Sequence, residues 1–338
     1  MANARDVARL AGVSVSTVSR ALAHHSQVSA VTRERVTAIA AQLGYRPHTL
    51  ARGLRLGRTH VLGLLVPDLE NPSFASVTKG VHARARAAGY AVFVADSEEA
   101  RSAEPTLLAE FAQRVDGVIV ASPRSDDETL RRALGELPHV LVNRDAVGLP
   151  SVDADDADGV TQALGHLHAL GHRTVAVAAG PTSSWSGTRR VEGLRRAAER
   201  LGDVTLVELG SFRPYFSGGL AAADHAVASG ATAVVAFNDL MALGILDRLR
   251  GRGVRVPEDI SVVGFDDVAF ATLVSPALTT VRVPHIGLGQ SAVDLLVGML
   301  DDASSAAAGS AGASDAVAHE QLPVELVIRG SSGVVPQK

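Results

Sequence analysis

The residues best suited to recognition chemistry lie at positions 15–22, in the sequence VSTVSRAL. Helical spacing places Val18 and Ala21 on one face, so the hydroxyl groups and the single arginine, Arg20, share the other face. Such a face suits the major groove of DNA, where arginine can hold guanine through two hydrogen bonds and hydroxyls can reach bases or phosphates. The alternative is an ordinary helical hairpin with a solvated polar face.

Neighbouring residues predict the elements that position this helix. Asn3 can cap a preceding helix, and Asp6 places a carboxylate near its positive end. Gly12 can adopt the left-handed conformation that ends that helix, and Ser14 can cap the next one. The sequence therefore predicts two helices across a tight turn, with a third helix over 29–44.

Charge is unevenly distributed along the chain. Residues 1–58 carry nine arginines, no lysine and two acidic residues, which gives a net charge of +7. Residues 59–338 carry 23 basic and 34 acidic residues, which gives −11, and the sum is −4. The positive charge of residues 1–58 could belong to an ordinary solvated surface. It is also the charge that attraction to the phosphates of nucleic acid requires.

A short basic segment, YRPHTLARGLRLGR, occupies residues 45–58. Pro47 can open a helix, but the two turns that follow are too short to be stable alone in water, and Gly53 weakens them further. DNA and a partner chain could supply the surface on which this segment folds. Leu54 would then be an apolar wedge in the minor groove. Alternatively, the segment is a linker and Leu54 packs on the next domain.

From residue 60 onward, short valine-rich strands alternate with alanine-rich helical stretches, and this layout occurs twice. The alternation predicts the α/β class, with two doubly wound parallel sheets covered by helices on both faces. Ligands of such sheets bind beyond the carboxyl ends of the strands, so a cleft between the two halves is the expected site. The residues at the predicted strand ends are Pro67, Asp68, Asn143, Arg144, Asp145, Gly180, Pro181, Asn238, Asp239, Phe265 and Asp266.

The chain resembles the lactose/galactose repressor (LacI/GalR) family of bacterial transcription regulators. The resemblance is carried by DVARLAGVSVSTVSRAL and YRP…LARGL, and in the body by LGHRTVAVAAGPTSSWSGTRRVEGL, FNDLMALGIL, VPEDISVVGFDD and PALTTVRVP. It covers nearly the whole chain. It implies an all-α helix-turn-helix domain followed by a core like that of the periplasmic binding proteins.

By this resemblance, the second helix enters the major groove and two hinge helices pair over the minor groove. Val15, Ser16 and Arg20 match base-reading positions, and Leu54 matches the wedge. The predicted DNA-binding residues are Val15, Ser16, Thr17, Ser19, Arg20, Arg52 and Leu54. His48 stands where the family commonly has asparagine, and Gly53 lies inside the hinge helix, so the hinge should depend more heavily on the operator.

The resemblance also implies a small-molecule site between the core halves. Arg190 fits an arginine that grips ligand hydroxyls or a carboxylate, while Asp266 and Asn238 can bind vicinal hydroxyls. The predicted effector-binding residues are Phe74, Asp158, Ser184, Trp185, Ser186, Arg190, Phe212, Asn238 and Asp266. The alternatives are a structural ion pair between Arg190 and Asp266, and core packing of Phe74 and Phe212.

The predicted domains are a helix-turn-helix domain at 1–46, a hinge helix and linker at 47–58, and an effector-binding and dimerisation core at 59–338. The first subdomain of the core should comprise about 60–157 and 286–318, and the second about 159–283 and 320–330. Residues 301–319 are of low complexity and should form a loop before one last strand, QLPVELVIRG. No heptad leucine segment follows, which favours a dimer over a tetramer.

Other chemistry finds little support. The chain has no cysteine, no apolar run long enough to span a membrane and no signal-peptide core. His166, His168 and His172 are offset by two and six residues, which does not place metal ligands on one helix face. No P-loop, G-x-S-x-G or H-E-x-x-H motif occurs. We therefore expect no cofactor, no metal and no catalysis, and a cytoplasmic location.

Together these features predict a DNA-binding transcriptional regulator, with a repressor favoured, that acts as a homodimer on a near-palindromic operator. A sugar or sugar derivative bound between the core halves would control it allosterically. A solute-binding module is the alternative, which explains the core but leaves the basic head without a purpose. An enzyme on the same scaffold is a third hypothesis, for which the sequence offers no catalytic constellation.

Overall fold

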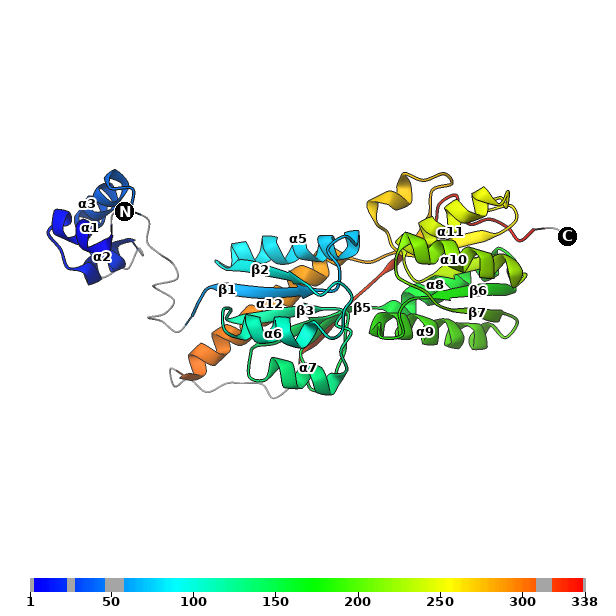
Figure 1. Ribbon diagram of the computed structural model, residues 1–338, viewed down its shortest axis with the longest axis horizontal. Coiled ribbons are helices and arrows are strands. Elements are labelled where there is room, and N and C mark those ends of the chain that lie inside the picture. The colour runs from blue at the N-terminus through cyan, green and yellow to red at the C-terminus, as the bar shows by residue number, and fades with distance from the viewer. Residues whose placement is uncertain (1–2, 23–27, 46–57, 308–317, 337–338) are drawn as a thin grey trace. The chain divides into compact units, whose positions relative to one another are not determined.

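The computed structural model describes residues 3–22, 28–45, 58–307 and 318–336 of the chain (Figure 1). The chain divides into two compact units, Met1–Thr59 and His60–Lys338. The predicted hinge, including His48, Arg52, Gly53 and Leu54, lies outside the described residues.

Within its described residues, the first unit consists of the helices α1 (Ala4–Ala11), α2 (Val15–Leu22) and α3 (Ala30–Gln42). The predicted cap of α1 is formed, because the Asn3 side chain accepts from the Asp6 N–H and the Asp6 carboxylate accepts from the Asn3 N–H. Gly12 ends the helix with a φ of 63°. The core of this unit contains Val7, Ala8, Ala11, Val18, Ala21, Val28, Val36 and Ala40.

The second unit contains two six-stranded sheets, which we call its first and second halves. The first sheet has the order β11 (His319–Leu322), β5 (Ser151–Ala154), β4 (His139–Val142), β3 (Gly117–Ala121), β1 (Val61–Val66), β2 (Ala91–Asp96). The second has the order β12 (Glu325–Val327), β10 (Thr279–Arg282), β9 (Ser261–Asp266), β8 (Ala233–Ala236), β6 (Thr174–Ala179), β7 (Thr205–Ser211). Neighbouring strands are parallel, except that β12 runs antiparallel to β10. The predicted fold class is confirmed.

Helices cover both faces of each sheet, because apolar side chains point to both sides of the central strands. In the first half, α5 (Pro72–Ala87) and α12 (His285–Ala307) cover one face, and α6 (Glu104–Ala112) and α7 (Asp127–Leu134) cover the other. In the second half, α8 (Asp156–Ala169) and α9 (Trp185–Leu201) lie opposite α10 (Phe216–Ala228) and α11 (Asp239–Gly251). A short 3-10 helix, η1 (Ala269–Thr272), follows β9.

The described chain passes between the two halves after β5, after β10 and after β11 (Figure 1). The prediction for the last crossing was wrong. Residues 320–330 were expected to form one strand of the second half. Instead β11 pairs with β5 in the first sheet, and β12 pairs with β10 in the second. Pro323 separates these strands, since it has no N–H to donate to a sheet. Helix α12 also continues to Ala307, where a loop was expected.

Candidate functional site

Helix α2 exposes most of the residues predicted to read DNA. Ser14 begins the helix, because its Oγ accepts a hydrogen bond from the Thr17 N–H at 3.1 Å. Val18 and Ala21 are buried, which fixes the rotation of the helix, and Thr17 is half-buried. The exposed side chains of this helix face are Val15, Ser16, Ser19 and Arg20.

The polar groups at the start of α2 contact one another. Ser14 Oγ lies 2.7 Å from Ser16 Oγ and 2.8 Å from Thr17 Oγ1. Arg20 Nε donates to the Ser16 carbonyl at 3.4 Å, and a terminal nitrogen lies 3.5 Å from Ser16 Oγ. Because a guanidinium has five N–H donors, Arg20 can still bind another acceptor. This surface can hydrogen-bond base edges and phosphates.

A polar pocket lies between the two halves of the core. Its lining from the first half is Asn71, Ser73, Phe74, Glu99, Ser122, Arg124 and Asn143, together with His285 at the start of α12. Its lining from the second half is Ser184, Ser186, Arg190, Pro214, Phe237, Asn238 and Asp266. A hydrogen bond of 3.2 Å from Ser186 Oγ to the Asn143 carbonyl joins the two walls. The carboxyl ends of strands from both sheets therefore meet here, as such sheets require.

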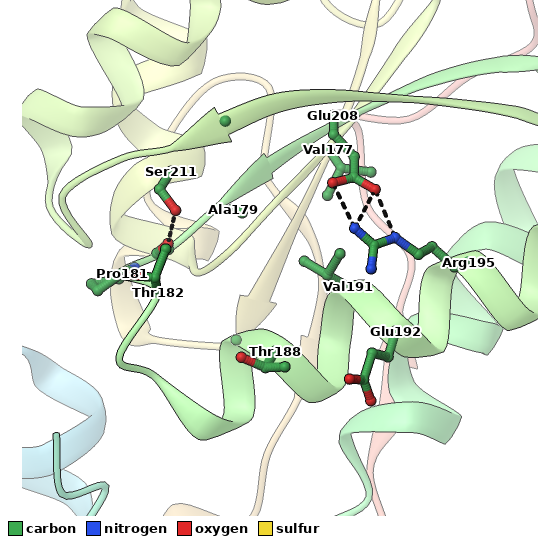
Figure 2. A pocket seen from close by; sticks show the side chains of 13 residues that line it. Val177, Ala179, Pro181, Thr182, Thr188, Val191, Glu192, Arg195, Glu208 and Ser211 are labelled. Carbon is green, nitrogen blue, oxygen red and sulfur yellow. Dashed lines mark hydrogen bonds and ion pairs between the residues drawn. The ribbon is translucent and has the colours of Figure 1, made fainter. Parts of the chain in front are cut away.

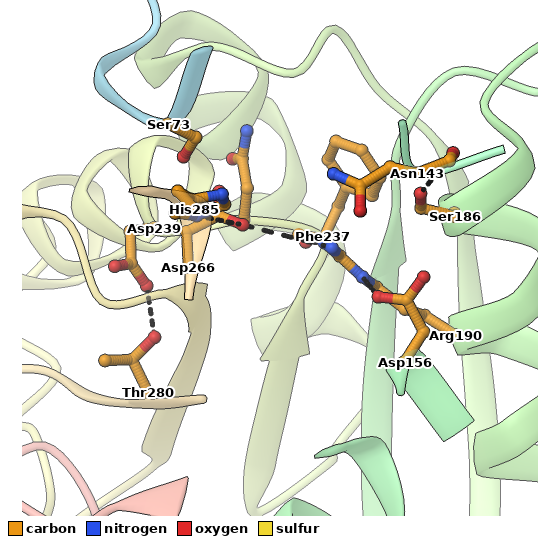
Figure 3. Close-up of polar contacts among 12 residues, drawn as sticks. Ser73, Asn143, Asp156, Ser186, Arg190, Phe237, Asp239, Asp266, Thr280 and His285 are labelled. Atoms are coloured by element: carbon orange, nitrogen blue, oxygen red, sulfur yellow. Dashed lines mark hydrogen bonds and ion pairs between the residues drawn. The ribbon is translucent and has the colours of Figure 1, made fainter. Parts of the chain in front are cut away.

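Arg190 organises the wall formed by the second half (Figure 3). Its Nε donates to Asp156 Oδ1 at 2.8 Å, and a terminal nitrogen donates to the Phe237 carbonyl at 2.7 Å. The guanidinium carbon lies 3.6 Å from the centre of the Phe265 ring. Asp266 Oδ1 is 3.9 Å from the nearest Arg190 nitrogen. The tight ion pair is therefore with Asp156, and Asp266 keeps capacity for another partner.

Two buried carboxyl groups, Asp156 and Asp266, lie beside this arginine, and a third buried carboxyl group, Asp239, interacts with Asp266. Burial raises the pKa of all three, and the pKa of Asp266 reaches about 6 because Arg190 offsets burial only in part. Asp239 Oδ1 accepts from Thr280 Oγ1 at 2.5 Å. Asp266 has a φ of 116°, a strained backbone conformation for a residue other than glycine. Such strain clusters at binding and active sites.

The wall formed by the first half holds a second buried arginine. Arg124 Nε and a terminal nitrogen donate to the two carboxylate oxygens of Glu99 at 2.6 and 2.8 Å, and the other terminal nitrogen donates to the Ser122 carbonyl at 3.0 Å. Tyr215 reaches this wall from the second half, and burial together with the charge of Asp68 raises its pKa to about 12. Both guanidinium groups of the pocket are thus already paired with carboxylates.

Six of the predicted effector residues line the pocket: Phe74, Ser184, Ser186, Arg190, Asn238 and Asp266. Two of them also serve their own helices, since Ser184 caps α9 and Asn238 caps α11. The Asn238 amide nitrogen further donates to the Pro214 carbonyl at 3.0 Å. Phe74 both lines the pocket and packs in the core.

Three predicted effector residues lie elsewhere. Asp158 is exposed on α8, and Asp156 contacts the pocket arginine instead, because two positions turn an α-helix by about 200°. Phe212 packs against the hydrophobic core of the second half, which was its alternative role. Trp185 is half-buried, with the Arg189 guanidinium 5.2 Å from its ring centre. The aromatic side chains that line the pocket are Phe74 and Phe237.

Several lining residues were not identified from the sequence: Asn71, Ser73, Glu99, Ser122, Arg124, Phe237 and His285. Most of them follow strands β1, β2, β3 and β8, so the same strand-end argument that selected Asp266 could have found them. His285 follows β10, a four-residue strand that the hydrophobic pattern did not reveal.

A larger cavity of about 260 Å³ lies on the second half between β7 and α9 (Figure 2). Val177, Ala179 and Val191 give it an apolar lining, and Arg195 donates to both carboxylate oxygens of Glu208 at 2.7 and 2.8 Å. Both charged side chains are about half exposed, so this pair contributes little stability. None of the buried polar atoms found without a partner in the described residues lines this cavity, in contrast to the polar pocket.

The described residues contain no helix that is long and apolar enough to cross a membrane, and no group of three potential ligands arranged to hold a metal ion. The histidines at 166, 168 and 172 each contact different hydroxyl or carboxylate groups rather than a shared centre.

A helix-turn-helix unit joined to a core with a polar pocket between two α/β halves defines a ligand-responsive DNA-binding regulator. Residues 3–48 match the bacterial regulatory proteins of the lacI family, and residues 164–332 match the periplasmic binding protein-like domain. The transcriptional repressor CytR of Escherichia coli (strain K12) is 30% identical, over 99% of this chain and 97% of the relative.

Solved structures agree with this assignment. The Lac repressor dimer bound to operator and the anti-inducer ONPF gives a TM-score of 0.87 at 30% identity, over 98% of this chain and 99% of that chain. The complex of the transcriptional regulator CelR with cellobiose gives 0.69 at 30% identity, over 98% and 100%. The chain belongs to the lacI family of bacterial regulatory proteins. It is a DNA-binding transcriptional regulator with an effector-binding core, which confirms the predicted resemblance.

Proposed function

We propose that this chain is a repressor that binds a near-palindromic operator as a homodimer and responds to a sugar or sugar derivative in the polar pocket. The observation that carries this proposal is that one chain holds both the exposed polar face of α2 and a buried polar pocket between two core halves. The repressor CytR, the operator-bound Lac repressor dimer and the cellobiose complex of CelR support it. Since its target is chromosomal DNA, we place the protein in the cytoplasm.

On the DNA side, α2 would lie in the major groove with Val15, Ser16, Thr17, Ser19 and Arg20 at the bases and phosphates. The net charge of +7 over residues 1–58 would supply the attraction to phosphate that does not depend on sequence. A dimer related by a two-fold axis reads two half-sites, which is why the operator should be near-palindromic. Arg52 and Leu54 would contact the minor groove between the half-sites.

On the ligand side, the pocket measures only about 40 Å³, so a sugar could enter only after the halves move apart. The Ser186–Asn143 hydrogen bond and the interaction of Tyr215 with Asp68 favour the closed arrangement. A ligand changes DNA binding only if it binds one arrangement better than the other. We propose binding without turnover, because Asp156 is bound by Arg190 and Asp239 by Thr280, so neither is a free partner with which Asp266 could form an acid–base pair.

The proposal is tested by letting the purified full-length protein select fragments of genomic DNA. We expect a site with two-fold symmetry whose affinity falls steeply with salt, because phosphate contacts release counterions. Arg20→Ala should weaken binding at the selected site by about 1–3 kcal/mol and relax the preference at one base position.

Arg132→Ala, which removes an exposed arginine on α7, is the matched control and should bind as the parent does. Equal loss by Arg20→Ala on selected and unselected DNA would show that Arg20 contacts only phosphate. Failure to enrich any symmetric site would contradict the proposed repressor.

A further inference from the structure

The cavity between β7 and α9 lies where the second sheet becomes irregular. Strand β7 is an outer strand of this sheet, and its register with β6 shifts between Val177 and Ala179, so β7 has one extra residue between Glu208 and Ser211. Gly210, within this bulge, has a φ of 103°, a conformation that favours glycine. A bulge bends its strand, and bulges are frequent beside active sites. The hollow next to α9 is therefore built into the backbone.

The size of the cavity suits one small molecule. It measures about 260 Å³, whereas the polar pocket measures about 40 Å³. A protein cavity of about 150 Å³ can hold benzene, so a substituted ring or a two-ring compound fits here without movement of the protein. Among the described residues, none lines both the cavity and the polar pocket. The cavity is thus a separate space.

The hydroxyl groups of the cavity lining that have a recorded contact are already bonded to the protein. Ser211 Oγ donates to the Gly180 carbonyl at 2.9 Å, and Thr188 Oγ1 donates to the Ser184 carbonyl at 3.2 Å. A sugar placed here would have to compete for these groups while it lost its own bonds to water, which is costly. The lining therefore favours an apolar molecule over a polyol.

The charged residues of the lining favour an uncharged aromatic ring. Arg195 and Glu208 lie at one end of the cavity, with Val191 beside them (Figure 2). The two bonds from Arg195 to the carboxylate of Glu208 hold its guanidinium in one plane, on which an aromatic ring can stack. Two carboxylates, Glu192 and Glu208, stand against this one guanidinium in the lining, so an anion would be repelled.

We propose that the cavity between β7 and α9 is a second small-molecule site, separate from the polar pocket, which binds an uncharged aromatic compound on the apolar surface of Val177, Ala179 and Val191. The Arg195 guanidinium contacts the ring. Helix α9 thus serves two sites, because it carries Arg190 to the polar pocket and Val191 to this cavity.

The test is calorimetry of the full-length protein with benzyl alcohol and with indole. We expect saturable binding of one molecule per chain, with a dissociation constant of about 1 mM or lower. Two compounds of similar size serve as comparisons. Cyclohexylmethanol lacks the aromatic ring and should bind about two- to fivefold more weakly, and benzoate carries a charge and should bind at least about tenfold more weakly.

Variants of α9 locate the site. Thr188→Phe and Val191→Phe each place a ring in the cavity and should weaken binding of benzyl alcohol by at least about 30-fold. Glu199→Phe introduces the same side chain at an exposed position of α9 outside the lining, and it should bind as the parent does. The melting temperature without any added compound shows whether each variant is folded.

A further variant tests the contact between the ring and the guanidinium. Arg195→Leu keeps an apolar side chain but removes the cation. It should weaken binding of benzyl alcohol by about two- to fivefold and leave binding of cyclohexylmethanol unchanged, because only the aromatic ring interacts with the cation.

Each outcome bears on the proposal. Saturable binding that both cavity-filling variants lose and Glu199→Phe keeps supports the second site. Binding that persists in folded Thr188→Phe and Val191→Phe variants overturns it, as does the absence of saturable binding in the parent. Equal binding of benzyl alcohol and cyclohexylmethanol, or tighter binding of benzoate, overturns the assignment to an uncharged aromatic compound. None of these results depends on the operator or on the sugar.

Discussion

At the scale of single residues, the charged groups of the pocket differ in whether they are already paired with a group of opposite charge. Arg190 is bound to Asp156 and Arg124 is bound to Glu99, whereas Asp266 lies 3.9 Å from the nearest guanidinium nitrogen. The motif resemblance selected Arg190 and Asp266 from the sequence. It selected Asp158 in place of Asp156, because both carboxylates lie two positions apart on the same helix and match the pattern equally well. Only the rotation of the helix decides which of the two faces the pocket.

Aromatic residues were the least predictable part of the site. Phe212 and Trp185 were expected as walls for a sugar ring, but one packs in the core and the other under an arginine. An aromatic side chain buries the same apolar surface in either setting, so the residue type does not distinguish them. Phe237, which does line the pocket, immediately precedes the predicted contact Asn238.

Asp266 should make ligand binding depend on pH. Its pKa is raised to about 6, and an ionised carboxylate is the stronger acceptor for a ligand hydroxyl. Affinity for the bound sugar should therefore be constant above about pH 7 and fall below about pH 6, by at most about tenfold per pH unit, as one proton binds. Of the groups that face it, His285 stays neutral in this range, because its pKa is lowered to about 3, while Asp156 and Asp239 have raised pKa values.

Calorimetry between about pH 5 and pH 8 measures this profile. Asp266→Asn keeps the shape of the side chain but cannot ionise, so it should bind more weakly and lose the dependence on pH. An unchanged slope in Asp266→Asn would assign the titration to Asp156 or Asp239 instead.

At the scale of helices and strands, periodicity predicted the alternating α/β pattern and the paired helices of the first unit. It did not reveal β5 or β10, because strands of four residues are too short to show a period. The crossing of β11 to the first sheet also escaped prediction, since a single apolar run covers two strands that belong to different sheets. Because β10 was not predicted, His285, which follows this strand, was not selected as a strand-end residue. Local pattern therefore gave the architecture but not all of the site.

The contact between α5 and α12 places the two helices that carry Ser73 and His285. It depends on glycine, because a Cβ at Gly289 would lie 2.4 Å from the Val77 carbonyl oxygen and 2.9 Å from the Val81 backbone nitrogen. Gly289→Ala should force the helices apart and destabilise the core by about 1–3 kcal/mol, measured by urea unfolding.

Gly298→Ala is the matched control on the same helix, since a Cβ there meets nothing within 4 Å. It should be neutral or stabilise the core by up to about 1 kcal/mol, because alanine favours a helix over glycine. Equal stability of the two variants would show that close approach of the helices is not required.

At the scale of the whole molecule, DNA binding and ligand binding reside in separate compact units of the chain. The core halves are linked by chain crossings after β5, β10 and β11, and two of these crossings lead directly to pocket residues or their partners, Asp156 and His285. A ligand held by groups from both halves thus acts where the halves are connected. Such a ligand favours one arrangement of the core and shifts the population toward it.

The most direct test of the account is the affinity of the full-length protein for its selected operator, measured with and without a saturating amount of the free sugar that binds the pocket. We expect a change of about 5- to 150-fold, and by thermodynamic linkage the operator must change the affinity for the sugar by the same factor. Identical operator affinity in the presence and absence of that sugar would contradict it.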